Sequence, residues 1–122
     1  MTYSDAHFGR VAVLCGGNSS ERNISIESGI AVYDALKRLS INSQLIDIRD
    51  NFRDVVYEAA FDRAFIAMHG SDGEDGSLQG ALKLLNIPFT GSHVLASALA
   101  MDKTRSKQVW LSHGLATPDY IE

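Results

Sequence analysis

A short apolar strand that ends in a Gly-Gly turn constrains the fold of this 122-residue chain more than any other feature. The apolar run is Val11 to Cys15, the turn is Gly16-Gly17, and polar residues then lead into a helical pattern. An unbroken apolar run is typical of a strand that is covered on both faces, which favours a parallel sheet with helices on each side. A strand-turn-helix junction also gathers backbone N–H donors and the positive end of a helix dipole, where small anionic molecules bind.

The rest of the sequence continues to alternate between strand and helix patterns. Further strands are predicted over residues 43–48, 64–69 and, more briefly, 86–91. Helices are predicted over residues 24–39, 51–60, 77–85 with Ser77 as N-cap, 94–101, and from Asp102 to His113 with Gly114 as the stop. Residues 115–122 have the pattern of a further strand. Short crossovers between parallel strands are right-handed, so the predicted fold class is α/β, a Rossmann-like open parallel sheet flanked by helices.

Composition excludes several classes of partner. The chain is 45% hydrophobic and 21% charged with a formal net charge of -4, values ordinary for one globular domain. Its basic residues are dispersed, so we expect neither nucleic acid nor an anionic membrane as partner. The lone Cys15 is expected to be a small buried hydrophobe in a reducing compartment. Since neither a signal peptide nor a run of about 20 apolar residues is found, a cytoplasmic location is expected.

Named phosphate and metal motifs do not fit the sequence. Neither Gly16 nor Gly17 is followed by glycines at the spacing of a dinucleotide fingerprint, and no P-loop lysine follows either turn. The acidic residues of segment 72–75 suggest a calcium loop, but Ser77 and Lys83 stand where such a loop needs glycine and glutamate. This segment is therefore interpreted as a solvated turn, and no metal site is predicted.

Two residues are placed where open α/β sheets bind ligands, beyond the carboxyl ends of the strands. Glu21 follows the first strand and is suited to holding a substrate ammonium, although it also fits a simple role as dipole partner in the first helical turn. His69 closes the third predicted strand and enters the glycine-rich segment 70–76. Its imidazole is suited to proton or charge chemistry with a ligand, although a purely structural histidine fits the pattern equally well.

Lys103 and Lys107 lie four residues apart, on one face of the last predicted helix. This arrangement suits a basic contact to phosphate. Taken alone, it also fits an exposed, charged helix.

Taken together, these motifs resemble the N-terminal part of the D-alanine-D-alanine ligases of the ATP-grasp superfamily. The segments that carry the resemblance follow one another in order through most of the chain: 13–25 with Ser28-Gly29, 65–70, 73–80, and 88–92 leading into 96–103. The resemblance implies a pre-ATP-grasp domain over residues 1–101 and the start of the ATP-grasp domain over 102–122.

The resemblance also implies a two-step reaction. ATP phosphorylates the carboxylate of one D-alanine, and the amine of a second D-alanine attacks the acyl phosphate to give the dipeptide used in peptidoglycan. It assigns Glu21 to the ammonium of the first D-alanine, His69 to the region of its carboxylate, and Ile24 to its methyl group. Ser25 adjoins this substrate at the helix start, and Lys103 reaches the nucleotide phosphates.

The remaining implications concern the complete enzyme. The family uses ATP with Mg²⁺ (or Mn²⁺), commonly forms homodimers, and carries its main nucleotide- and metal-binding elements beyond the position of Glu122. We therefore expect the 122-residue chain alone to be inactive. Two alternatives stay open, a stand-alone module that binds a small ligand, and a related ligase that uses D-lactate or D-serine as its second substrate.

Overall fold

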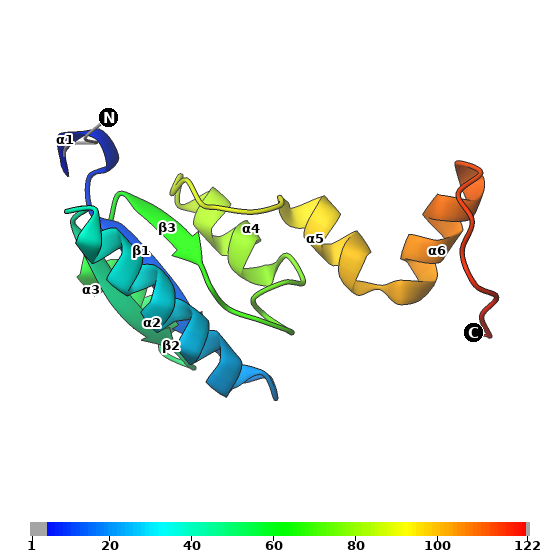
Figure 1. Ribbon diagram of the computed structural model, residues 1–122, viewed down its shortest axis with the longest axis horizontal. Coiled ribbons are helices and arrows are strands. Elements are labelled where there is room, and N and C mark those ends of the chain that lie inside the picture. Colours follow the sequence, from blue (N-terminus) through cyan, green and yellow to red (C-terminus); the bar gives the residue numbers. More distant parts are fainter. Residues whose placement is uncertain (1–4, 122) are drawn as a thin grey trace.

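The computed structural model describes residues 5–121 and contains a three-stranded parallel sheet (Figure 1). Its strands are β1 (Val11–Gly16), β2 (Ser43–Ile48) and β3 (Arg63–Ile66), in the order β2-β1-β3. In the central register Val13 pairs with Leu45 on one side and with Phe65 on the other. The predicted parallel α/β fold is therefore confirmed.

Six helices accompany the sheet within the described residues. Their bounds are α1 (Asp5–Phe8), α2 (Arg22–Arg38), α3 (Phe52–Ala59), α4 (Ser77–Leu84), α5 (Val94–Met101) and α6 (Lys103–Ser112). None of the helices in this part of the chain is long and apolar enough to cross a bilayer.

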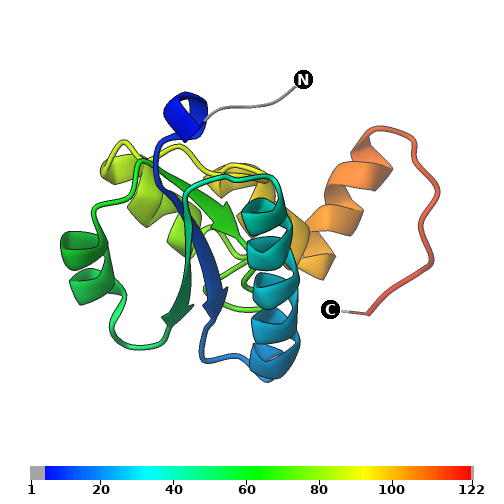
Figure 2. The ribbon, with the colours of Figure 1, turned by 60° about the vertical axis from the view of Figure 1, so that its left-hand side comes forward.

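Helices lie on both sides of the sheet (Figure 2), and each face packs in its own hydrophobic cluster. On one face Val13 and Cys15 pack against apolar side chains of α2. On the other, Ala12 and Leu14 pack against residues of α3 and α4 that include Leu82. Every residue of β1 is consequently buried, which is the physical reason for its unbroken apolar sequence.

The third strand is shorter than the sequence predicts, and the fourth predicted strand is not formed. β3 ends at Ile66 instead of residue 69, and segment 86–91 contributes only a single parallel bridge, between Ala64 and Phe89. The ladder stops because the Ile66 N–H donates to the side-chain Oγ1 of Thr90, at 3.1 Å, and not to a backbone carbonyl. Pro88, which lacks an N–H, cannot donate to a ladder.

The helix boundaries also differ in detail from the sequence prediction. Ser77 is the first residue of α4 and not its cap, because Gly76 occupies the N-cap position with φ +94° and the carboxylate of Asp75 accepts the Ser77 N–H at 2.9 Å. Asp102 does cap α6, where its side chain accepts the Arg105 N–H at 2.9 Å. No strand forms between α6 and residue 121, the last described residue.

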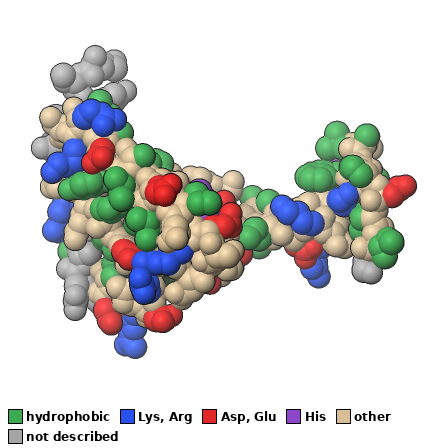
Figure 3. All heavy atoms as spheres, turned by 60° about the horizontal axis from the view of Figure 1, so that its bottom comes forward, with side chains coloured by type: hydrophobic (Ala, Val, Ile, Leu, Met, Phe, Trp, Pro, Cys, Tyr) green, Lys and Arg blue, Asp and Glu red, His purple; other side chains and the backbone are tan. Residues whose placement is uncertain are grey.

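Helices α5 and α6 form an arm that leads away from the sheet (Figure 1). The Ser106 hydroxyl of α6 donates to the Leu99 carbonyl of α5 at 2.7 Å and joins the two helices. Figure 3 shows hydrophobic and basic side chains on the surface of the arm. The exposed apolar residues there include Leu95, Trp110 and Leu111.

Gly29 brings α2 unusually close to the sheet, and its replacement by alanine is expected to destabilise the protein by about 1–2 kcal/mol. A Cβ at this position would lie 2.6 Å from Cys15 Cβ and 3.0 Å from its Sγ. This overpacking outweighs the better helix propensity of alanine. Urea unfolding of Gly29→Ala measures the loss. Gly80→Ala is the matched control, because its Cβ would find only ordinary contact with Val94 at 3.8 Å. Equal stability of the two variants would contradict the close approach.

Candidate functional site

The Gly-Gly turn places the start of α2 above the carboxyl end of β1. Gly16 and Gly17 have φ values of +91° and +82°, which side chains other than glycine rarely adopt. The Gly17 N–H donates to the Ile48 carbonyl at 2.7 Å, so the turn is also tied to the end of β2.

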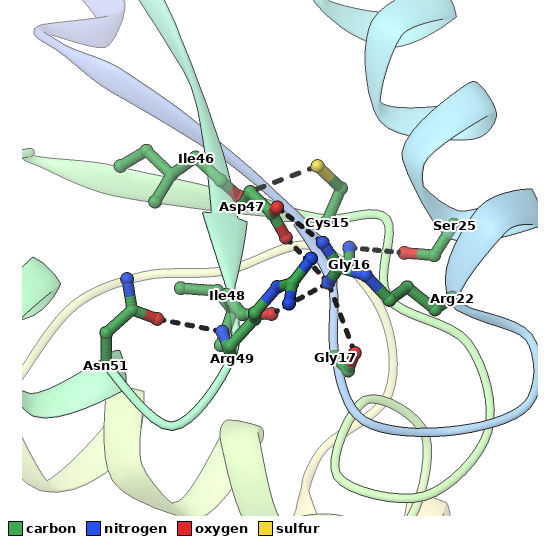
Figure 4. A network of polar contacts seen from close by, with 10 residues as sticks. All are labelled: Cys15, Gly16, Gly17, Arg22, Ser25, Ile46, Asp47, Ile48, Arg49 and Asn51. Atoms are coloured by element: carbon green, nitrogen blue, oxygen red, sulfur yellow. Dashed lines mark hydrogen bonds and ion pairs between the residues drawn. The ribbon is translucent and has the colours of Figure 1, made fainter.

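An ion pair behind the turn holds it in place (Figure 4). The Arg22 guanidinium meets the Asp47 carboxylate at two points, Nη1 to Oδ1 at 2.8 Å and Nη2 to Oδ2 at 2.5 Å. Nη1 also lies 3.3 Å from the Gly17 carbonyl oxygen. The hydrogen bonds to Asp47 raise the pKa of Arg22 above its ordinary value. Because Arg22 directly follows Glu21, this clamp fixes the backbone that carries the Glu21 carboxylate.

Ser25 is fully buried beneath the turn. Its Oγ accepts the Gly16 N–H at 2.8 Å and donates to the Ala67 carbonyl at 2.8 Å. One hydroxyl thus joins β1, α2 and the segment after β3. In this structure Ser25 supports the turn from below, and the contact with substrate that the resemblance assigns to it stays a prediction.

Ser19 connects the two loops that follow β1 and β3. Its hydroxyl donates to the His69 carbonyl at 2.9 Å and accepts the Glu21 N–H at 3.2 Å. Glu21 Oε2 is so close to the second loop that a Cβ on Gly70 would lie 2.7 Å from it. The structure therefore brings Glu21 and the residues beside His69 to the same edge of the sheet.

The Glu21 carboxylate is available for a ligand. Glu21 occupies the N-cap position of α2, yet its side chain makes no capping hydrogen bond. Its exposed carboxylate has no hydrogen-bond or ion-pair partner among residues 5–121. An unpaired, exposed carboxylate is suited to binding an ammonium group.

The His69 imidazole is held between α2 and the loop that follows β3. Its Nε2 lies 3.1 Å from Ser28 Oγ, and its Nδ1 lies 3.7 Å from Glu74 Oε1. His69 and Glu74 also line an open hollow of about 330 Å³, which Ser97 of α5 lines as well. The ring, 32% exposed, is accessible from this hollow.

The other two predicted contact residues lie at different distances from this edge. Ile24 is on the first turn of α2 and is 59% exposed, so an apolar side chain stands near Glu21. Lys103 is the first residue of α6, which packs on α5, and both views show α6 apart from the sheet (Figures 1 and 2). The structure thus does not bring Lys103 next to Glu21 and His69.

The sequence analysis did not predict that the carboxylates of the acidic loop accept hydrogen bonds from the backbone of the same loop. Glu74 Oε2 accepts the Gly70 N–H at 2.8 Å, and Asp75 accepts the N–H groups of Asp72 and Ser77, each at 2.9 Å. Burial raises the pKa of Asp75, but these hydrogen bonds together outweigh burial and lower it. The segment is an exposed turn, as predicted, with Asp72 and Glu74 exposed, but its carboxylates also make hydrogen bonds within the loop that were not predicted. The signal was the spacing, because a carboxylate four residues after Gly70 can close the loop on itself.

No metal site is formed by the part of the chain that the structure describes. Within residues 5–121, no group of three or more histidine, cysteine or acidic side chains could hold a metal ion.

Cys15 is buried against α2, as the sequence predicts, and stability is expected to fall in alkaline solution because of it. Burial, followed by the nearby Asp47 charge, raises the pKa of the thiol. A raised folded-state pKa contributes stability below the unfolded thiol pKa of about 8.5, and this is lost as pH rises through the folded value. Thermal midpoints between about pH 7 and pH 10 measure the effect. The decline should be shallower in Cys15→Ala, and parallel curves would contradict it.

The sequence of this chain matches a known protein family over most of its length. A family model described as D-ala D-ala ligase N-terminus matches residues 10–60 and 50–92. The chain belongs to this family. It is 54% identical over 113 residues to a D-alanine--D-alanine ligase of Azoarcus sp. (strain BH72), covering 93% of this chain and 37% of the relative. It is 56% identical over 111 residues to a D-alanine--D-alanine ligase B of Pseudomonas putida, covering 91% and 35%.

Solved structures agree with this family assignment. The D-alanine--D-alanine ligase of Bacillus anthracis matches with a TM-score of 0.78 and 38% identity, covering 92% of this chain and 37% of that protein. The same ligase complexed with ATP matches with a TM-score of 0.77 over 92% and 38%. The chain therefore spans little more than a third of the length of the ligases it matches.

Proposed function

We propose that this chain is the part of a D-alanine-D-alanine ligase that binds the first D-alanine. The observation that carries the proposal is the meeting of the unpaired Glu21 carboxylate with the His69 loop at one edge of the sheet. Identity above 50% to proteins named as this ligase supports the choice of substrate.

Each proposed role follows from the chemistry of the side chain. Glu21 binds the ammonium of D-alanine by a charge-assisted hydrogen bond. His69 lies toward the carboxylate, Ile24 faces the methyl group, and Ser25 keeps the turn beneath them in place. Holding both ends of the amino acid fixes the carboxylate in one position, and such orientation lowers the barrier of a transfer reaction.

The proposed reaction joins two D-alanines. ATP transfers its terminal phosphoryl group to the carboxylate of the first D-alanine. The amine of the second then attacks the acyl carbon, a C–N bond forms, and phosphate leaves. A transferable acyl phosphate needs charge stabilisation and exclusion of water more than it needs a strong base. In this scheme Glu21 and His69 bind and orient, and neither forms a covalent bond.

Other parts of the proposal concern the complete protein. Lys103 contacts the nucleotide phosphates where an ATP-grasp domain, beginning at residue 102, follows the domain of residues 1–101. ATP is the phosphoryl donor, and the ATP complex of the B. anthracis ligase supports this. The described residues do not fit a Mg²⁺ site, so no step here uses the metal. We also propose that the complete protein is a homodimer and that it is located in the cytoplasm.

A chimera tests the proposed function. In the Azoarcus ligase the matching segment, 113 residues long, is replaced by that of this chain. We expect the chimera to release ADP only when D-alanine is present, while the 122-residue chain alone releases none. A folded chimera without D-alanine-dependent ADP release would refute the proposal. D-alanine binding by the chain without turnover in the chimera identifies a simple binding module.

A further inference from the structure

Two groups face the His69 ring, and a third holds its backbone. Ser28 Oγ faces Nε2 at 3.1 Å, within hydrogen-bonding distance. Glu74 Oε1 faces Nδ1 at 3.7 Å, within the range of an ion pair. The His69 carbonyl is fixed separately by the Ser19 hydroxyl at 2.9 Å. Each ring nitrogen of His69 therefore has a neighbouring polar group, and its backbone carbonyl accepts a hydrogen bond.

Glu74 is itself held firmly by the loop that it closes. Its Oε2 accepts the Gly70 N–H at 2.8 Å, and its own N–H donates to the Gly70 carbonyl at 2.9 Å. One carboxylate oxygen is thus committed to the backbone, and the other is directed at the imidazole. A side chain that joins a loop to the adjacent ring is placed to orient that ring.

We infer that Glu74 is a positioning residue that selects the tautomer of His69 and so holds its ring between α2 and the loop, at the edge where the substrate carboxylate is proposed to bind. A neutral imidazole has one N–H and one lone pair, and the partner of one nitrogen decides the role of the other. The carboxylate of Glu74 favours the proton on Nδ1, so Nε2 accepts the hydroxyl hydrogen of Ser28. The substrate part of this inference rests on the proposed function, whereas the tautomer does not.

Glutamine at position 74 provides a specific test, because it should invert the tautomer. The glutamine Oε1 can still accept the Gly70 N–H, which leaves its NH₂ group facing Nδ1. An NH₂ group needs a lone pair opposite it, so the proton moves to Nε2 and is donated to Ser28 Oγ. The loop closure is kept, and only the polarity at the ring changes.

Nitrogen-15 NMR of the imidazoles in the 122-residue chain measures the tautomer directly, in alkaline buffer where histidine is neutral. We expect the proton on Nδ1 in the parent protein and on Nε2 in Glu74→Gln. Asp72→Asn is the matched control, because it removes one negative charge from the same loop and should leave the tautomer unchanged. In Ser28→Ala the proton should stay on Nδ1. The same tautomer in the parent and in Glu74→Gln, or an inversion in Ser28→Ala, would overturn the inference.

Kinetics of the chimera test the consequence for binding. Glu74→Gln should raise the KM for D-alanine several-fold, up to about tenfold, because a neutral amide then holds the ring in place of a carboxylate, with the KM for ATP unchanged. An inverted tautomer without a change in KM for D-alanine would refute the positioning role. If the parent chimera is inactive, the proposed function fails, and the NMR result still decides whether Glu74 selects the tautomer.

Discussion

Replacing Glu21 with glutamine is expected to raise the KM of the chimeric ligase for D-alanine by about 10- to 100-fold, which corresponds to the loss of one hydrogen bond between charged groups. The amide has nearly the shape of the carboxylate but lacks its charge. The Glu21 carboxylate has no hydrogen-bond or ion-pair partner among the described residues, so its full charge is available to an ammonium. Steady-state release of ADP at varied D-alanine concentrations measures the change.

Glu27→Gln is the control for this substitution. Glu27 is an exposed acid on the same helix, so its replacement removes the same charge without touching the turn. Its KM for D-alanine should stay within about twofold of the parent value, because changes at exposed positions have small effects. If Glu21→Gln behaves like Glu27→Gln, the carboxylate has only a role beside the helix dipole and the proposed ammonium contact is wrong.

The alternation of apolar strands and amphipathic helices was sufficient to predict the sheet. β1 and β2 have the predicted bounds to within a residue. Burial on both faces leaves β1 an unbroken apolar pattern, whereas β2 is only partly buried and has polar residues among its apolar ones. The prediction failed at segment 86–91, where the Thr90 hydroxyl takes the place of a backbone acceptor. Such a competition between side chain and backbone depends on three-dimensional position and has no periodic signature.

The candidate site was predictable only in part, for a similar reason. Glu21 and His69 could be placed at one edge because parallel strands end on the same side of a sheet. The clamp of Arg22 on Asp47 joins residues 25 positions apart, and no local spacing predicts such a pair. Glu74 was overlooked because a cluster of acids in a glycine-rich loop usually faces solvent.

Alanine at Gly16 is expected to lower the free energy of unfolding by about 3 kcal/mol or more, because two penalties coincide there. The backbone has φ +91°, which is strained for any residue with a Cβ. That Cβ would also lie 2.1 Å from Asp47 Oδ1 and 2.9 Å from the Ile48 carbonyl oxygen. The clamp that holds the Glu21 turn must therefore open. Chemical denaturation measures the loss.

Gly91→Ala separates the two penalties. Gly91 has a similar φ of +101°, but a Cβ there would meet no atom within 4 Å, so this variant reports backbone strain alone. Gly16→Ala should exceed it by at least about 1 kcal/mol, the lower range for overpacking. In an Asp47→Ala background the excess should shrink, because the nearest clashing atom is absent, and such non-additivity is expected of residues in contact. If Gly16→Ala and Gly91→Ala lower the free energy of unfolding equally, the Arg22–Asp47 ion pair moves aside at no measurable cost. Glycine would then be needed in the Gly-Gly turn only for its backbone conformation.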